Sequence, residues 1–127
     1  MNPPTLTLGA TVVTLPMPST TPTPQRTLDE RRVSRRTIGG RLRTTVLSYS
    51  YVYRFGFTSA TWPDHEALHD LWQTAIATGT WPRFAFPDLW PSADGVEVAV
   101  DLGPVTHALP AGDLIAFDVT LEEVNPR

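Results

Sequence analysis

Hydrophobic and polar residues alternate along three stretches of the chain, and this period of two predicts half-buried β-strands. In residues 46–58 the apolar positions run from Leu47 to Phe57 and include the aromatic side chains, so we expect this face to lie in the core. Residues 96–102 and 113–124 alternate in the same way. Weaker strand patterns occur at two further places, residues 5–15 (with a bend at Gly9) and residues 84–86.

One stretch has the period of an α-helix, residues 61–79. Thr61 and Asp64 are spaced to cap its first turn, and Gly79 supplies the residue that ends it. The apolar positions recur at intervals of three and four residues, as expected for one helix face packed on a sheet. Five side chains are predicted to form this face: Leu68, Leu71, Trp72, Ala75 and Ile76.

Two polar segments do not fit a core. Residues 16–26 contain four prolines among Ser and Thr, which predicts either a loop or an extended arm that lies across a neighbouring subunit. Residues 31–45 predict a β-hairpin that turns at Gly39 and Gly40. Six arginines gather on this hairpin and are candidates for an interface: Arg31, Arg32, Arg35, Arg36, Arg41 and Arg43.

The length of 127 residues predicts a single domain, 1–127. Its fold class is α+β and mainly β: an antiparallel β-sandwich with one flanking α-helix and an extended proline-rich arm. The net charge of −3 argues against a dedicated nucleic-acid binder, so a solvated hairpin or a contact with another subunit is preferred for the arginines. The chain contains neither cysteine nor lysine, which excludes disulfides, thiolate ligands and Schiff-base chemistry.

The predicted helix contains His65-Glu66-Ala67-Leu68-His69, a match to the zinc-protease pattern H-E-x-x-H. Such a pair of histidines shares one helix face and can bind Zn²⁺ while the glutamate activates a water. A small zinc metallopeptidase that uses His65, His69 and Glu66 is therefore an alternative hypothesis. The apolar face centred on Leu68 favours an ordinary packing helix, with no metal, cofactor or catalytic residue.

A third hypothesis rests on tryptophans beside prolines. Trp81 and Trp90 lie in the segment TWPRFAFPDLWPS, and exposed tryptophans can stack on sugar rings. This would make the chain a carbohydrate-binding module. Tryptophans bracketed by proline also close the end of a core or fill a subunit interface, which is the interpretation we prefer for both residues.

The order of elements from residue 31 to residue 124 resembles a family of phage proteins. An aromatic strand (YSYVYRFGF) precedes a helix with D-x-E-x-L-x-x-L-W and a terminal glycine, then an aromatic-proline loop and a valine strand. The closing strand contains F-D-V-T-L-E-E-V. This arrangement is similar to small minor tail proteins of long-tailed bacteriophages, of the lambda minor tail protein M type, and to the N-terminal domain of distal tail proteins.

The resemblance implies a structural protein without enzymatic activity. Members of the family have a β-sandwich with one flanking helix and assemble as rings, usually hexameric, at the distal end of the tail tube. The ring joins the tube to the tail tip or baseplate hub proteins, so the expected location is the virion, after assembly in the host cytoplasm. In the sequence itself we identify no nucleic-acid binding site, and no apolar run is long enough to predict a membrane segment.

Overall fold

The computed structural model describes residues 3–19, 23–107 and 114–125. These residues form one α-helix, α1 (Trp62–Thr78), and a short 3-10 helix, η1 (Pro91–Ala93). Eight strands are described as well: β1 (Thr5–Leu8), β2 (Thr11–Thr14), β3 (Gln25–Arg36), β4 (Leu42–Thr61), β5 (Arg83–Ala85), β6 (Val96–Leu102), β7 (Thr106–His107) and β8 (Leu114–Glu123).

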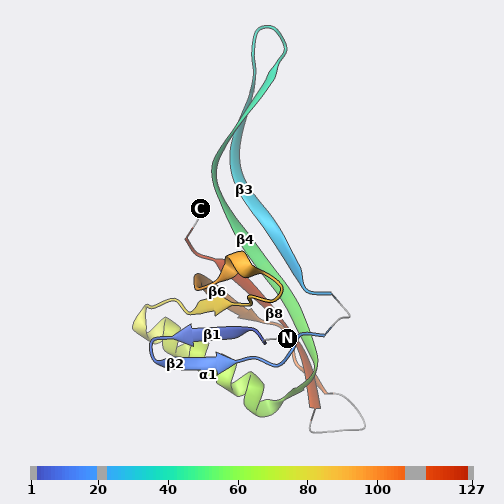
Figure 1. The fold of residues 1–127 in the computed structure, drawn as a ribbon, viewed down its shortest axis with the longest axis vertical. Coiled ribbons are helices and arrows are strands. Elements are labelled where there is room, and N and C mark those ends of the chain that lie inside the picture. Colours follow the sequence, from blue (N-terminus) through green and yellow to red (C-terminus); the bar gives the residue numbers. More distant parts are fainter. Residues whose placement is uncertain (1–2, 20–22, 108–113, 126–127) are drawn as a thin grey trace.

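The strands pair antiparallel in one continuous order, β2-β1-β5-β6-β8-β4-β3, and β7 pairs with β8. The sheet is strongly bent: β1, β2 and β6 run across the molecule, whereas β4 and β8 run along its long axis (Figure 1). Helix α1 packs against β4 and β2. The predicted class, α+β and mainly β with a sandwich-like arrangement and one flanking helix, is confirmed.

The core lies between the bent sheet and α1. Alternate residues of β8, from Ile115 to Leu121, are buried and face the aromatic residues of β4 and β5. Helix α1 buries Leu68, Leu71 and Ala75, and Trp72 packs at the margin of the core. The prediction for Ile76 is wrong, because this residue is 59% exposed. It lies at the edge of the helix face, beside Trp81, where the sheet does not reach.

The aromatic face of β4 is buried along only part of its length. Tyr53, Phe55 and Phe57 lie in the core, but Tyr49 and Leu47 are exposed, Leu47 by 61%. The prediction that the whole face packs in the core is therefore wrong for the N-terminal half of the strand. The physical reason is the pairing: β8 runs beside β4 only from Val52 onward, and before that residue β3 is the only described strand that pairs with β4, so this part of β4 extends beyond the core.

Two strand boundaries differ from those predicted. Residues 5–15 form two short strands, β1 and β2, because Gly9 adopts a left-handed conformation (φ 59°) and reverses the chain. The predicted hairpin at 31–45 is real but longer. Its second strand continues without a break as β4 to Thr61, and its first strand, β3, begins already at Gln25.

The proline-rich segment joins β2 to β3, and residues 20–22 lie outside the described part. Within the described part, the backbone N–H of Ser19 donates to the carbonyl oxygen of Gly56 at 2.8 Å. The Ser19 hydroxyl donates to the same oxygen at 3.2 Å. Pro16–Ser19 thus lies on the chain's own body, which favours a connecting loop there over an arm that reaches a neighbour.

A buried carboxylate fixes β4 at the point where β8 ends. Glu123, the last residue of β8, is 6% exposed. Its Oε2 accepts a hydrogen bond of 2.6 Å from the Tyr53 hydroxyl, and its Oε1 accepts one of 3.3 Å from the Tyr51 backbone N–H. Since a buried carboxylate needs such donors, these bonds hold the two strands in register.

We expect Tyr53→Phe to lower the free energy of unfolding by about 1–3 kcal/mol, because the buried Glu123 carboxylate loses its hydroxyl donor. Urea denaturation followed by circular dichroism measures this change. The matched control is Tyr49→Phe, four residues earlier on the same strand and exposed, which should change stability by less than about 0.5 kcal/mol. Equal stabilities for the two variants would contradict this role of Glu123.

Candidate interaction surface

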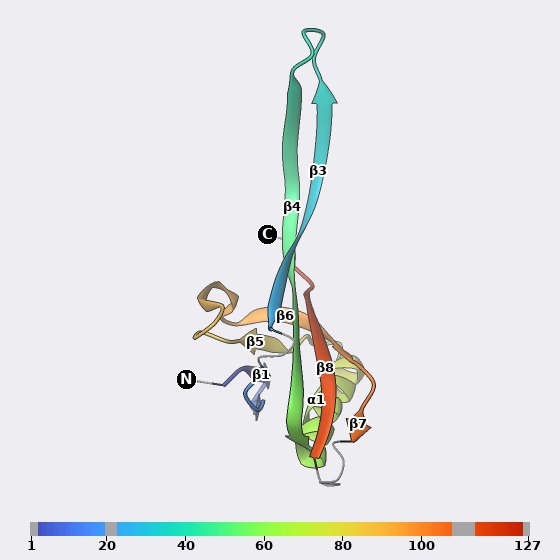
Figure 2. The same ribbon diagram turned by 90° about the vertical axis from the view of Figure 1, so that its right-hand side faces the viewer.

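A long two-stranded ribbon projects from the body of the molecule (Figures 1 and 2). It consists of the outer parts of β3 and β4 and the turn between them, residues 28–51, which we call the arm. Every residue of β3 is exposed. At the tip the Thr37 N–H donates to the Arg41 carbonyl oxygen at 2.8 Å, and Gly40 takes a positive φ of 83° to close the turn.

The arm and the rest of the chain carry opposite charge. Residues 28–51 contain six arginines against Asp29 and Glu30, a formal net charge of +4. The remaining residues contain four arginines against eleven acidic residues, a net charge of −7. The formal net charge of the whole chain, −3, is thus the sum of a basic arm and an acidic body. This separation of charge favours binding of a negatively charged partner to the arm.

The base of the arm is anchored to the body. The Arg26 guanidinium carbon lies 4.2 Å from the centroid of the Tyr51 ring, a cation–π contact. Nη1 of the same residue donates to the Ser92 hydroxyl at 2.8 Å. Arg26 was not a candidate in the sequence, since it stood in a proline-rich context that predicts a loop.

Further out, the six predicted interface arginines are brought onto one ribbon. Arg32 lies 3.9 Å from Glu30, and Arg36 donates to the Gly40 carbonyl oxygen at 3.3 Å. Arg35 and Arg43 are direct cross-strand partners, a like-charge pair that is unfavourable in an isolated ladder. Within the described residues neither of these two makes an ion pair.

The arm also exposes apolar side chains. Leu28 pairs with Tyr51 and so lies on the face that continues the core of the body. Leu42 and Leu47 are exposed as well, and Ile38 at the tip is fully exposed. The arginines of this hairpin were predictable from the sequence, but these apolar positions were not singled out. They could have been recognised in the sequence as single large apolar residues within a run of charged residues.

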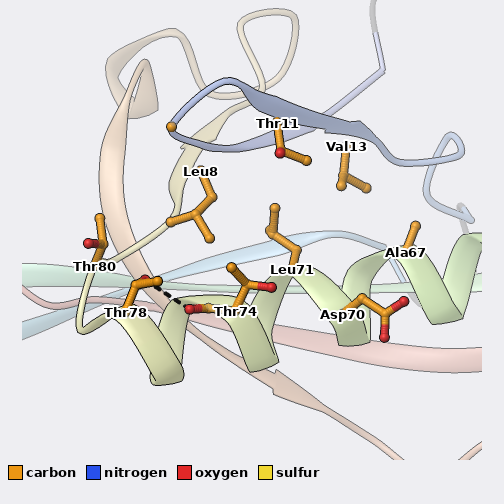
Figure 3. A pocket seen from close by; sticks show the side chains of 10 residues that line it. Leu8, Thr11, Val13, Ala67, Asp70, Leu71, Thr74, Thr78 and Thr80 are labelled. Carbon is orange, nitrogen blue, oxygen red and sulfur yellow. Dashed lines mark hydrogen bonds between the residues drawn. The ribbon is translucent and has the colours of Figure 1, made fainter.

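A groove of about 530 Å³ lies on the body, between the β1–β2 hairpin and α1 (Figure 3). Leu8 and Val13 line it from the hairpin, and Leu71 and Thr74 line it from the helix. Asp70 lies at its side with an exposed carboxylate. The groove is thus mainly apolar, with negative charge beside it, and no sequence pattern indicated it.

The two tryptophan candidates have different environments. Trp90 is only 8% exposed and packs in the core, with its ring centroid 5.0 Å from that of Tyr53. Of the two interpretations preferred for Trp90, its burial confirms closure of the core and contradicts a place at an interface. Trp81 is 42% exposed and stacks on Trp72 with ring centroids 6.0 Å apart, so its role at an interface stays a prediction.

The histidines of the H-E-x-x-H pattern lie side by side on the first half of α1. Their rings are nearly parallel with centroids 6.5 Å apart, and His65 packs edge-on against Phe117 at 5.0 Å. Glu66 is exposed. Asp64 accepts hydrogen bonds from both the N–H and the hydroxyl of Thr61, so it caps the helix as predicted.

A zinc site needs at least a third protein ligand beside two histidines. Outside the helix, Asp94, Glu97 and His107 have side chains of a type that could serve as this ligand. Glu97 lies on β6, 3.9 Å from Arg83, and the His107 side chain is outside the described part. Within the described residues, no group of three or more His, Cys, Asp or Glu side chains is placed to hold a metal ion.

We expect the chain, purified without chelator, to hold only substoichiometric zinc, because two partly exposed histidines cannot complete a tetrahedral site. Elemental analysis of the wild type, His65→Ala and His69→Ala tests this, and all three should give the same zinc content. One full equivalent of zinc that is lost in both variants would revive the metallopeptidase hypothesis.

The described part of the chain contains no helix with the length and apolar character that a bilayer crossing requires. Comparison of the chain with protein-family models, with curated proteins and with solved structures finds no match.

Proposed function

We propose that this chain is a structural component of a bacteriophage tail. It forms a ring, of six subunits in the arrangement that the resemblance implies, at the distal end of the tail tube. The ring joins the tube to the tail tip or baseplate. The chain acts in the virion by association with copies of itself and with tail proteins, without catalysis or a cofactor.

The observation that carries the proposal is the arm. A two-stranded ribbon without a covering layer is marginally stable in water on its own, and long exposed edge strands promote association. Residues 28–51 nevertheless project from the body with Leu28, Leu42 and Ile38 exposed. A surface of this kind is useful to a subunit that neighbouring molecules cover, which supports an assembly protein.

The rest of the surface agrees with an assembly role better than with an enzyme. The groove between the β1–β2 hairpin and α1 is mainly apolar and lined by threonine, leucine and valine side chains, with Asp70 as its charged residue. A catalytic site would need convergent acid, base or nucleophilic groups in such a groove. Fold class, arm and element order are together what the phage-tail resemblance leads one to expect.

We expect antibodies against this chain to label the distal end of the tail in particles of a phage that carries the gene. Immunogold electron microscopy shows the position, and mass spectrometry of purified particles shows the presence. Absence of the chain from complete particles, or label on the head or along the whole tube, would contradict the proposal.

A shortened arm gives a second measurement. In one variant, residues 31–48 are replaced by Asn-Gly, which joins the paired residues Glu30 and Tyr49 by a two-residue turn. We expect this chain to fold, because its core is unchanged, and to fail to complete tails when it replaces the wild-type gene. Counting complete tails by electron microscopy, with the wild-type gene supplied in trans as control, measures this. Normal numbers of complete tails would show that the arm is dispensable.

A further inference from the structure

We propose that the tip of the arm of one copy docks into the groove between the β1–β2 hairpin and α1 of a second copy. Ile38 enters the groove, and Arg35 and Arg43 lie against Glu66 and Asp70 of that copy. This inference rests on the proposed ring and deepens it, because it names the two surfaces that meet between subunits.

Ile38 has the properties of an anchor residue. It is fully exposed at the end of a projecting ribbon, beside the flexible pair Gly39 and Gly40. An apolar side chain in that place gains nothing in the free molecule, but it is the first group that meets a partner. Burial in an apolar pocket is what such a residue contributes to binding.

The groove offers the complementary surface. Leu8, Val13 and Leu71 give it apolar walls, and the methyl groups of threonines such as Thr74 continue them. Figure 3 shows these side chains pointing toward the space between the hairpin and the helix. Its volume of about 530 Å³ exceeds that of one isoleucine side chain, so part of the turn can enter with Ile38.

Like charges are paired unfavourably on each surface, and the two pairs have opposite sign. Arg35 and Arg43 face each other across the arm. Glu66 and Asp70 lie four residues apart on α1, which contains neither arginine nor lysine; Nδ1 of His69 lies 3.8 Å from the Asp70 carboxylate. The repulsion within each pair destabilises its own element slightly. Contact between the two pairs adds attractions between opposite charges, which offset both repulsions.

The distance from the tip of the arm to its arginines is similar to the distance from the groove to the acidic residues of α1. Arg35 lies two residues, about 7 Å of extended chain, before Thr37, where the turn that contains Ile38 begins. From Thr74, inside the groove, to Asp70 and Glu66 the helix rises about 6 and 12 Å. A tip seated in the groove along the helix axis therefore brings its arginines level with the acidic pair.

A second copy, rather than the same molecule, supplies the groove. The tip and the groove lie toward opposite ends of the long axis, so the arm cannot reach its own body (Figure 1). Arm and groove are different surfaces, which makes the contact heterologous. Such contacts repeat from subunit to subunit and close into a ring when the rotation allows.

Nucleic acid is a less favourable partner for the arm. The exposed apolar residues Ile38, Leu42 and Leu47 would not be buried by contact with a phosphate backbone. The charge of −7 on the rest of the chain would repel a polyanion drawn to the base of the arm. A protein surface that is apolar and acidic satisfies both features, and this chain carries one.

A charge exchange in full-length chains tests the contact. One variant has a reversed arm, Arg35→Glu with Arg43→Glu, and the other a reversed groove, Glu66→Arg with Asp70→Arg. Sedimentation velocity at low salt should show that the wild type associates and that each variant alone associates about a hundredfold more weakly. An equimolar mixture of the two variants should regain the association, because every interface then pairs opposite charges.

Two controls separate this contact from general effects. Arg54→Glu with Arg83→Glu changes the net charge by the same amount outside the arm and should leave association within about threefold of the wild type. Ile38→Ser removes the anchor from a fully exposed position and should weaken association about tenfold or more, without a change in thermal unfolding.

The inference is overturned if the wild type stays monomeric at low salt, or if it associates equally well with the reversed arm or the reversed groove. It is also overturned if the monomer binds duplex DNA through the arm and the exchange mixture does not associate. These outcomes differ from failure of the proposed function, which particle labelling decides. Chains that associate through these residues yet are absent from tails would leave the contact standing and remove the tail assignment.

Discussion

The geometry of this molecule depends on the buried Glu123 carboxylate and on the two donors it binds from β4. Strand β8 ends there, and beyond that residue β3 is the only described strand that pairs with β4. The hydrogen bonds to Tyr53 and Tyr51 fix the last point at which three strands lie together. With Arg26 bound to Ser92 and placed over Tyr51, they give the arm a firm base and a defined direction. A ribbon that is directed in the free molecule loses less entropy when a partner binds it.

The sequence predicted those elements whose pattern reflects burial of one face. Residues 96–102 and 113–124 alternate because one face of each lies in the core, and the helix at 61–79 repeats its apolar residues for the same reason. Strand β3 has no such pattern because neither of its faces is buried. Its first half, Gln25–Glu30, is a strand because β4 beside it is rich in aromatic and β-branched residues and offers it a ladder. That pairing is a tertiary effect, which local composition does not record.

The sequence predicted part of the candidate surface, the arginines of the arm, but not the groove. Six arginines close to a Gly-Gly pair indicated an exposed hairpin, and the structure places all six on the arm. The predictions of an interface role for Trp90 and of a buried Ile76 were wrong for different reasons. A proline-flanked tryptophan can close a core or face a neighbouring subunit, and the sequence does not decide between the two; Trp90 closes the core. Ile76 continues the apolar periodicity one step beyond the reach of the sheet. The groove lies between two short strands and a helix about 60 residues later in the chain, so no local sequence motif predicts it.

Whether the basic arm can neutralise the acidic body of its own molecule depends on how easily the arm bends back. A flexible basic segment on an acidic body would fold back and neutralise itself, and the molecule would present little field to others. In this chain the arm is a hydrogen-bonded ladder anchored at Glu123 and Arg26, and its tip lies far from the acidic helix (Figure 2). Its positive charge can therefore be neutralised only by another molecule. Because the body of each copy carries the opposite charge, attraction between the arm of one copy and the body of another grows as the salt concentration falls.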